Sequence, residues 1–177
     1  MKRLLEEFPD SVRLVTTTSR EPRPDEVDGV DYSFVDPDHF QHMIERGDFI
    51  EWEENYGNLY GSERAKLDEA LENHPLVFVA LDIRGAKTYQ KKFPEAATMA
   101  IFVPSDQIPS RILGRAPMDS IELEQRVEAI RDEQSEVGIF DFVVENEDGK
   151  FEEQTIPHAK DFVADALSAH QHEEKKK

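Results

Sequence analysis

Nearly continuous apolar runs and helical patterns alternate through the second half of the chain. Leu76–Leu81, Met99–Val103 and Phe140–Val144 are rich in aliphatic and aromatic residues, which is typical of strands that are covered on both faces. Helical patterns separate or follow these runs, over about 85–93, 105–113, 120–134 and 153–169. Buried strands that alternate with helices predict an α/β fold, a parallel sheet flanked by helices and joined by right-handed crossovers.

The first half of the chain predicts shorter elements. Asp36 and Pro37 should begin a helix, because an Asp side chain accepts from free N–H groups and Pro lacks an N–H. That helix presents apolar side chains at helical spacing and should end at Gly47. The remaining patterns predict a helix at 2–8, strands at 12–17, 31–35 and 49–56, a tight turn at 57–61 and a helix at 64–72. We therefore expect a small α+β subdomain over about 31–62.

Composition limits the classes of function. The 177 residues include 39 acidic and 21 basic side chains, for a formal net charge of -18, so the surface should repel nucleic acid. The chain contains no cysteine, and neither a secretory leader nor a membrane span is evident. We expect one cytoplasmic domain over 1–170 with a frayed, charged tail at 171–177. Its histidines lack a convergent third ligand, so no metal site is predicted.

Two arginines on a proline-rich loop are candidate phosphate ligands. Arg20 and Arg23 lie three residues apart, and their guanidinium groups could clamp one dianionic phosphate. The phenolic groups of Tyr32 and Tyr60 could donate to the same oxygens. Taken alone, two arginines in a polar loop are more often ordinary surface charges.

A carboxylate and a hydroxyl are candidate readers of a guanine base. Guanine presents two adjacent N–H donors beside the O6 acceptor. Glu51 on a strand could accept from both donors, and Ser62 could donate to O6. The alternative for Glu51 is an outward-facing strand carboxylate.

These motifs, in this order, resemble the guanylate kinase family. The resemblance rests on Val15–Arg23, Asp31-Tyr32, Phe49–Trp52 and Gly57–Ser62, and it extends over nearly the whole chain. It implies the fold of P-loop nucleoside monophosphate kinases. It also implies GMP as a ligand, with phosphate contacts from Thr16, Arg20, Arg23, Tyr32 and Tyr60 and guanine contacts from Glu51, Ser62 and Asp82.

The resemblance implies a helical lid over about 105–135. Arg111, Arg115 and Arg126 would be its catalytic residues and would neutralise the transferring phosphate. Asn146 would lie beside the adenine of the donor nucleotide. The alternative for the arginines is helix-surface charge paired with Glu122, Glu124 and Glu128.

The chain departs from the family pattern on the donor side. No G-x-x-x-x-G-K-[ST] phosphate loop occurs in the 177 residues, so the resemblance implies that the first central strand and its loop are missing. Ala80 replaces an acidic residue, and Ala116-Pro117 replaces the usual Gly-Thr of the lid. The family uses ATP and Mg²⁺, whereas these departures argue against their use here. We expect GMP binding with negligible kinase activity.

The missing strand would lie between Leu76–Leu81 and Met99–Val103. Three alternatives follow. The edges of these two strands could close on each other, or a missing N-terminal segment or a protein partner could supply the strand. The third alternative is that the sequence is incomplete. A second hypothesis for the function is a non-catalytic guanylate-kinase-like module that binds phosphorylated peptides. Glu51 with Ser62 favours a nucleotide, because a peptide reader does not need a guanine-reading pair.

Overall fold

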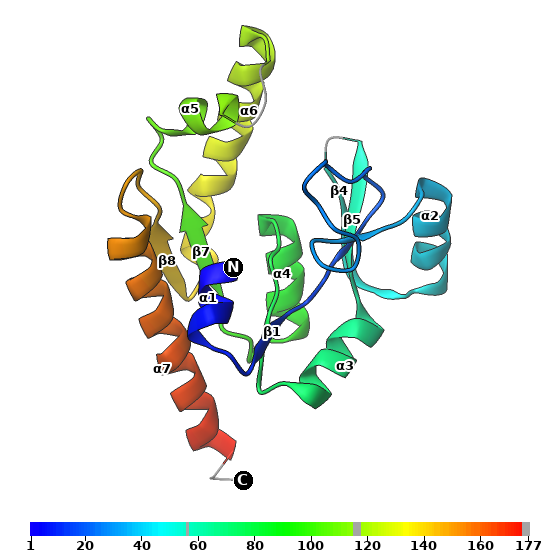
Figure 1. Cartoon of the computed structure of the whole chain (residues 1–177), viewed down its shortest axis with the longest axis vertical. Helices are drawn as coiled ribbons and strands as arrows, with labels where there is room; N and C mark the ends of the chain where they lie inside the picture. The colour runs from blue at the N-terminus through cyan, green and yellow to red at the C-terminus, as the bar shows by residue number, and fades with distance from the viewer. Residues whose placement is uncertain (56, 115–117, 175–177) are drawn as a thin grey trace. The chain divides into compact units, whose positions relative to one another are not determined.

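A computed structural model describes residues 1–55, 57–114 and 118–174 (Figure 1). The chain divides into two compact units, Met1–Pro94 and Glu95–Lys177. The predicted α/β class is correct, with parallel strand pairs and flanking helices in both units. Among the described residues, no helix is long and apolar enough to cross a membrane.

The first unit begins with a helix and a parallel strand pair. Helix α1 spans Lys2–Glu7, and β1, Ser11–Arg13, pairs in parallel with β6, Leu76–Phe78. The single strand predicted at 12–17 is wrong, because the chain leaves β1 and forms β2, Thr17–Thr18, in another sheet. Pairing partners that lie far away in the sequence decide this break, and local β propensity does not report them.

The second sheet of this unit carries four short strands in the order β3-β2-β5-β4. Strand β3 is Ser33–Phe34, β4 is Phe49–Asn55 and β5 is Asn58–Glu63; β4 and β5 form an antiparallel pair. The tight turn predicted at 57–61 is therefore wrong. Gly57 adopts the left-handed conformation, at φ 74°, and the residues from Asn58 onward continue as a strand.

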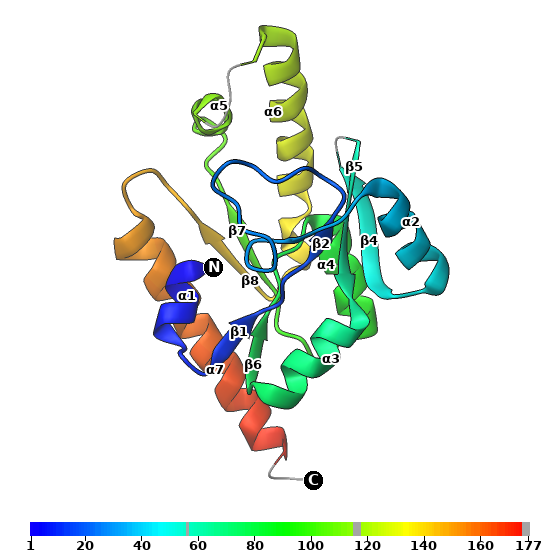
Figure 2. The same cartoon turned by 45° about the vertical axis from the view of Figure 1, so that its right-hand side comes forward.

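Helix α2, Pro37–Arg46, begins and ends as predicted. The Asp36 side chain accepts from the His39 N–H at 2.8 Å, and Gly47 ends the helix at φ 74°. The buried Phe40 ring stacks on Phe49 of β4, with ring centroids 4.5 Å apart. This packing places α2 against the outer strand of the four-stranded sheet, where both views show it (Figures 1 and 2).

Besides the packing of Phe40 on Phe49, another apolar cluster packs the four-stranded sheet against the rest of the first unit. Helix α3 spans Arg64–Asn73 and α4 spans Ile83–Lys92. Leu67 of α3 and Tyr89 of α4 pack with Leu14 and with Ile50 of β4, all of them buried. The cluster fixes β4 against α4, and this contact positions the candidate site.

The second unit has its own parallel strand pair. Strands β7, Met99–Phe102, and β8, Phe142–Glu145, pair in parallel. The helices are α5, Ile108–Leu113, α6, Ser120–Ser135, and α7, Ile156–Glu174, with a 3-10 turn at Val137–Ile139 and a π turn at Phe151–Thr155. Helix α7 lies along β8 in both views. It reaches Glu174, and the frayed tail stays a prediction.

The apolar strands are less buried than their sequences predict. Residues 76–79 of the β6 region and 99–102 of β7 are half-buried or exposed, so burial on both faces is wrong for them. The physical reason is the pairing, since β6 hydrogen-bonds to β1 and β7 to β8 in separate two-stranded sheets.

Candidate functional site

The predicted guanine-reading pair is assembled across β4 and β5. Glu51 lies opposite Ser62 in the strand register, and the Ser62 hydroxyl donates to Glu51 Oε1 at 2.6 Å. Glu51 is 9% exposed and Ser62 is fully buried. A register irregularity between Phe49 and Glu51 turns the Glu51 side chain inward, as bulges do. The outward-facing alternative for Glu51 is therefore wrong.

Burial decides the electrostatics of Glu51. Desolvation raises the pKa of its carboxyl group, and the negative charges of Asp82 and Glu53 raise it further, whereas the Ser62 hydrogen bond lowers it. Burial also raises the pKa of the neighbouring Tyr89 to about 12. A ligand that brings N–H donors to Glu51 would compensate its ionised form.

The start of helix α4 adds a second carboxylate. Asp82 Oδ1 accepts from the Gly85 N–H at 2.8 Å, and Asp82 Oδ2 accepts from Asn55 Nδ2 at 2.7 Å. A Cβ at Gly85 would lie 3.1 Å from Glu51 Oε2 and 3.4 Å from Asp82 Oδ1. Gly85 therefore lets both carboxylates approach the start of the helix. Sequence reasoning missed Gly85 and Asn55, although an Asp three residues before a Gly is a visible capping signal.

Three of the predicted phosphate ligands lie together. The Arg20 guanidinium carbon lies 5.6 Å from the centre of the Tyr32 ring, and the rings of Tyr32 and Tyr60 meet edge-on at 6.1 Å. Tyr60 also hydrogen-bonds to Arg20. Because Tyr60 and Ser62 are two residues apart on β5, both side chains project from one face of the strand. That strand thus connects the arginine cluster to the carboxylate pair.

The other two predicted phosphate ligands are placed differently. The Arg23 side chain is 71% exposed, so it is available to a ligand but is held less firmly than Arg20. Thr16 is buried, and its carbonyl oxygen accepts from the Ser33 N–H at 2.9 Å. This bond stabilises the entry to β3.

Sequence reasoning missed an acidic residue inside the arginine cluster. Glu26 accepts from Arg20 Nη2 and from the Arg23 backbone N–H. Burial tends to lower the pKa of Arg20, but its hydrogen bonds with Glu26 and Tyr60 raise it overall. The backbone hydrogen bond from Arg23, followed by the contact with Arg20, lowers the pKa of Glu26. The only signal in the sequence is an acid three residues after Arg23.

The predicted lid residues belong to the second unit. Arg111 Nε donates to Asp148 Oδ1 at 3.0 Å, and Arg111 Nη2 donates to the Asn146 carbonyl oxygen at 2.5 Å. The suggested pairing of Arg111 with glutamates of the next helix is therefore wrong. Arg126 Nη2 lies 2.9 Å from Glu122 Oε1, as the surface-charge alternative expects. Arg115, like Ala116 and Pro117, lies outside the described residues.

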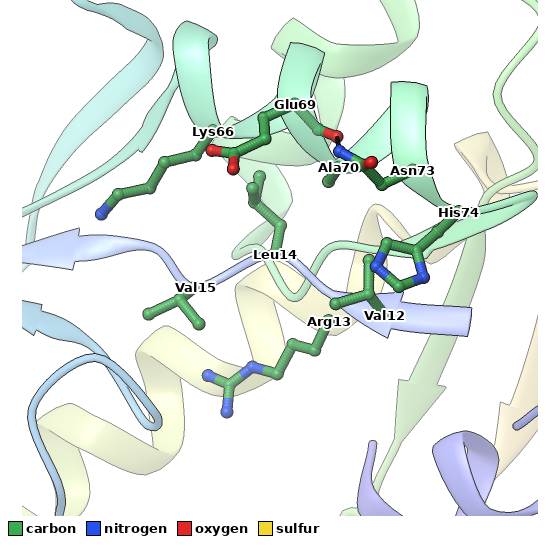
Figure 3. A pocket seen from close by; sticks show the side chains of 9 residues that line it. All are labelled: Val12, Arg13, Leu14, Val15, Lys66, Glu69, Ala70, Asn73 and His74. Carbon is green, nitrogen blue, oxygen red and sulfur yellow. Dashed lines mark hydrogen bonds between the residues drawn. The ribbon is translucent and has the colours of Figure 1, made fainter. Parts of the chain in front are cut away.

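A cavity of about 480 Å³ lies between β1 and α3, and none of its lining residues is a predicted site residue (Figure 3). Two of its basic side chains already have partners. Lys66 Nζ donates to Ser33 Oγ and lies 2.6 Å from Glu63 Oε1, and Arg13 Nη2 donates to the Asp31 carbonyl oxygen. Figure 3 shows the Arg13 guanidinium directed away from α3. We assign no function to this cavity.

The described residues do not fit the donor half of a kinase site. Within 1–55, 57–114 and 118–174, no group of three or more histidine and acidic side chains could hold a metal ion. The 177-residue sequence also contains no phosphate-loop motif that could cradle the phosphates of ATP.

Comparison with known proteins decides the family. The sequence pattern described as Guanylate kinase matches residues 1–166. The chain belongs to the guanylate kinase family. A guanylate kinase of Myxococcus xanthus is 40% identical over 148 residues, which are 82% of this chain and 71% of the relative. A guanylate kinase of Salinibacter ruber is 33% identical over 166 residues, which are 92% of this chain and 88% of the relative.

The fold agrees with this family assignment. The crystal structure of guanylate kinase from Anaplasma phagocytophilum superimposes with a TM-score of 0.69 at 26% identity, covering 96% of this chain and 80% of that one. The resemblance stated from the sequence motifs is thus confirmed at the level of the family. The roles of individual site residues stay predictions.

Proposed function

We propose that this chain binds GMP in its first unit, as the acceptor half of a guanylate kinase. The observation that carries the proposal is the buried Glu51–Ser62 pair on the same hairpin as Tyr60 of the arginine cluster. Base-reading groups and phosphate-binding groups are thereby linked through one rigid strand. The guanylate kinases among its relatives support GMP as the ligand.

The contacts at Glu51 suggest how guanine is read. In the free protein, the Ser62 hydroxyl occupies the carboxylate at 2.6 Å. The N1–H and amino group of guanine would replace that hydroxyl on Glu51, and the released Ser62 O–H would then donate to O6. Asp82 would accept from the remaining amino hydrogen. Adenine offers neither the N1–H nor the O6, so it would not replace the Ser62 hydroxyl on Glu51 and would make neither of these contacts.

The family reaction is phosphoryl transfer to GMP, which requires positioning and charge neutralisation and no protein nucleophile. In this proposal, Arg20, Arg23, Tyr32 and Tyr60 hold the acceptor phosphate, and Thr16 supports the start of that loop. Arg111, Arg115 and Arg126 would contribute positive charge from the lid, and Asn146 would contact adenine. Because the 177 residues contain no phosphate loop, we propose that this polypeptide alone transfers phosphate from ATP negligibly.

Calorimetric titration of the purified polypeptide with GMP, AMP and a phosphoserine peptide tests the proposal. We expect GMP to bind at least tenfold more tightly than AMP or the peptide. Equal affinity for GMP and AMP would refute the guanine assignment. Preference for the peptide would favour the interaction-module hypothesis, and turnover of ATP with GMP would refute the proposed lack of transfer.

A further inference from the structure

Glu26 is surrounded as a bound phosphate would be. Its two carboxylate oxygens lie 2.8 and 2.9 Å from Arg20 Nη2, and one of them accepts from the Arg23 backbone N–H at 2.8 Å. The Arg23 guanidinium lies 3.6 Å away. Two guanidinium groups and a backbone N–H therefore converge on one anion that belongs to the protein itself.

This contact uses the part of Arg20 that a phosphate needs. Arg20 Nη1 donates to the Glu21 carbonyl oxygen at 2.7 Å, and Arg20 Nη2 is engaged by Glu26. The terminal fork of the guanidinium, which binds oxyanions with two parallel hydrogen bonds, is thus already occupied. The rings of Tyr32 and Phe34 lie within 6 Å of its central carbon, so an anion must approach in the guanidinium plane.

We infer that Glu26 is an internal occupant of the phosphate clamp and that a dianionic phosphate displaces it. This inference rests on the proposed binding of GMP at Arg20 and Arg23. Glu26 lies in the loop between β2 and β3, outside regular strands, and its side chain can rotate away without breaking a sheet hydrogen bond. In the free clamp two guanidinium groups face one carboxylate, and the occupied clamp exchanges that carboxylate for a phosphate whose charge matches the two arginines more closely.

The exchange makes Glu26 a specificity-determining residue. A phosphate monoester brings a charge of about −1.5 to −2 and three acceptor oxygens, against one charge and two oxygens for a carboxylate. A dianionic phosphate therefore gains from displacing Glu26, whereas a carboxylate ligand exchanges like for like. The clamp should select phosphates over carboxylates, and removal of Glu26 should strengthen the binding of both kinds of anion.

The variant Glu26→Gln tests the inference. Glutamine keeps an acceptor oxygen for the Arg23 N–H but no longer competes as an anion. We expect its dissociation constants for GMP and for inorganic phosphate to fall by about 3- to 5-fold, the upper end of what a solvent-screened ion pair contributes. Binding of guanosine, which has no phosphate, should be unchanged. Asp25→Asn is the matched control, since it removes one negative charge from the adjacent, exposed position and should change phosphate binding less than twofold.

The sign of the change decides the result. Equal or weaker binding of both phosphate and GMP by Glu26→Gln would overturn the inference. Glu26 would then only stabilise the conformation of the loop. If phosphate binds more tightly to the variant but GMP binds to neither protein, the role of Glu26 as internal occupant of the clamp is confirmed. The proposed binding of GMP then fails. Should Glu26→Gln not fold, as judged by its thermal melt, Glu26→Asp must show the same direction of change, because the shorter side chain weakens the contact.

Discussion

Replacing Glu51 with Gln should stabilise the protein at neutral pH while weakening its binding of GMP. The carboxylate is 9% exposed, and burying an ion costs several kcal/mol even after relaxation. The 2.6 Å hydrogen bond from Ser62 returns about 1.5–3 kcal/mol. The raised pKa of Glu51 indicates that the burial cost is the larger of the two effects.

The pH dependence follows from the direction in which folding moves this pKa. A carboxyl whose pKa is raised on folding favours the folded state in its protonated form, so its contribution is complete below the ordinary value of 4.5. The contribution declines as pH rises from that value through the raised pKa, and it then levels off. The cost of burying the ion exceeds what the Ser62 hydrogen bond returns, so we expect Glu51→Gln to gain on the order of 1 kcal/mol at pH 7.

Thermal and urea unfolding of both proteins between pH 4 and pH 8 measures the effect. A gain of about 1 kcal/mol should raise Tm by roughly 2–4 °C for a chain of this size, and the difference should disappear near pH 4. Glu54→Gln, at an exposed position of the same strand, is the matched control and should change stability by less than about 0.5 kcal/mol. A Glu51→Gln protein that is less stable than wild type at pH 7 would refute the reasoning.

Three further substitutions test separate parts of the site. Gly85→Ala should weaken GMP binding about tenfold with little change in Tm, because its Cβ would crowd Glu51 Oε2 at 3.1 Å while alanine favours the helix; wild-type affinity would contradict this. Ser62→Ala should lower the free energy of unfolding by about 1–3 kcal/mol at pH 7, measured in urea, and an unchanged midpoint would exclude a stabilising Ser62–Glu51 bond. Arg23→Ala should weaken GMP binding without changing Tm, since its side chain is 71% exposed, whereas Arg20→Ala should lower both; equal melting of the two variants would contradict the difference in burial.

Local chemistry made several elements predictable from the sequence. The cap at Asp36 and the end of α2 at Gly47 depend on residues within one or two turns of each other. The break between β1 and β2 was not predictable in this way, because it depends on pairing with β6 and β5. The same holds for the half-buried strands, whose apolar sequences do not reveal how many neighbours they pair with.

The residues of the candidate site also divide into those that local sequence could identify and those that depend on tertiary contacts. Residue chemistry and order identified Glu51, Ser62 and Arg20, and the structure brings the first two into contact. Glu26 and Gly85 were missed, because their importance comes from tertiary contacts with the arginines and with Glu51. No spacing rule along the chain reports that an acid will fold back onto a cation.

The most direct test of the central claim is the affinity for GMP relative to IMP, which lacks only the exocyclic amino group. If Glu51 accepts from that group, wild type should prefer GMP by about 10- to 100-fold, the value of one hydrogen bond to a buried charge. In Glu51→Gln, the preference should fall to near unity. Equal binding of GMP and IMP by wild type, or an unchanged preference in Glu51→Gln, would contradict the assignment of Glu51 as the guanine reader.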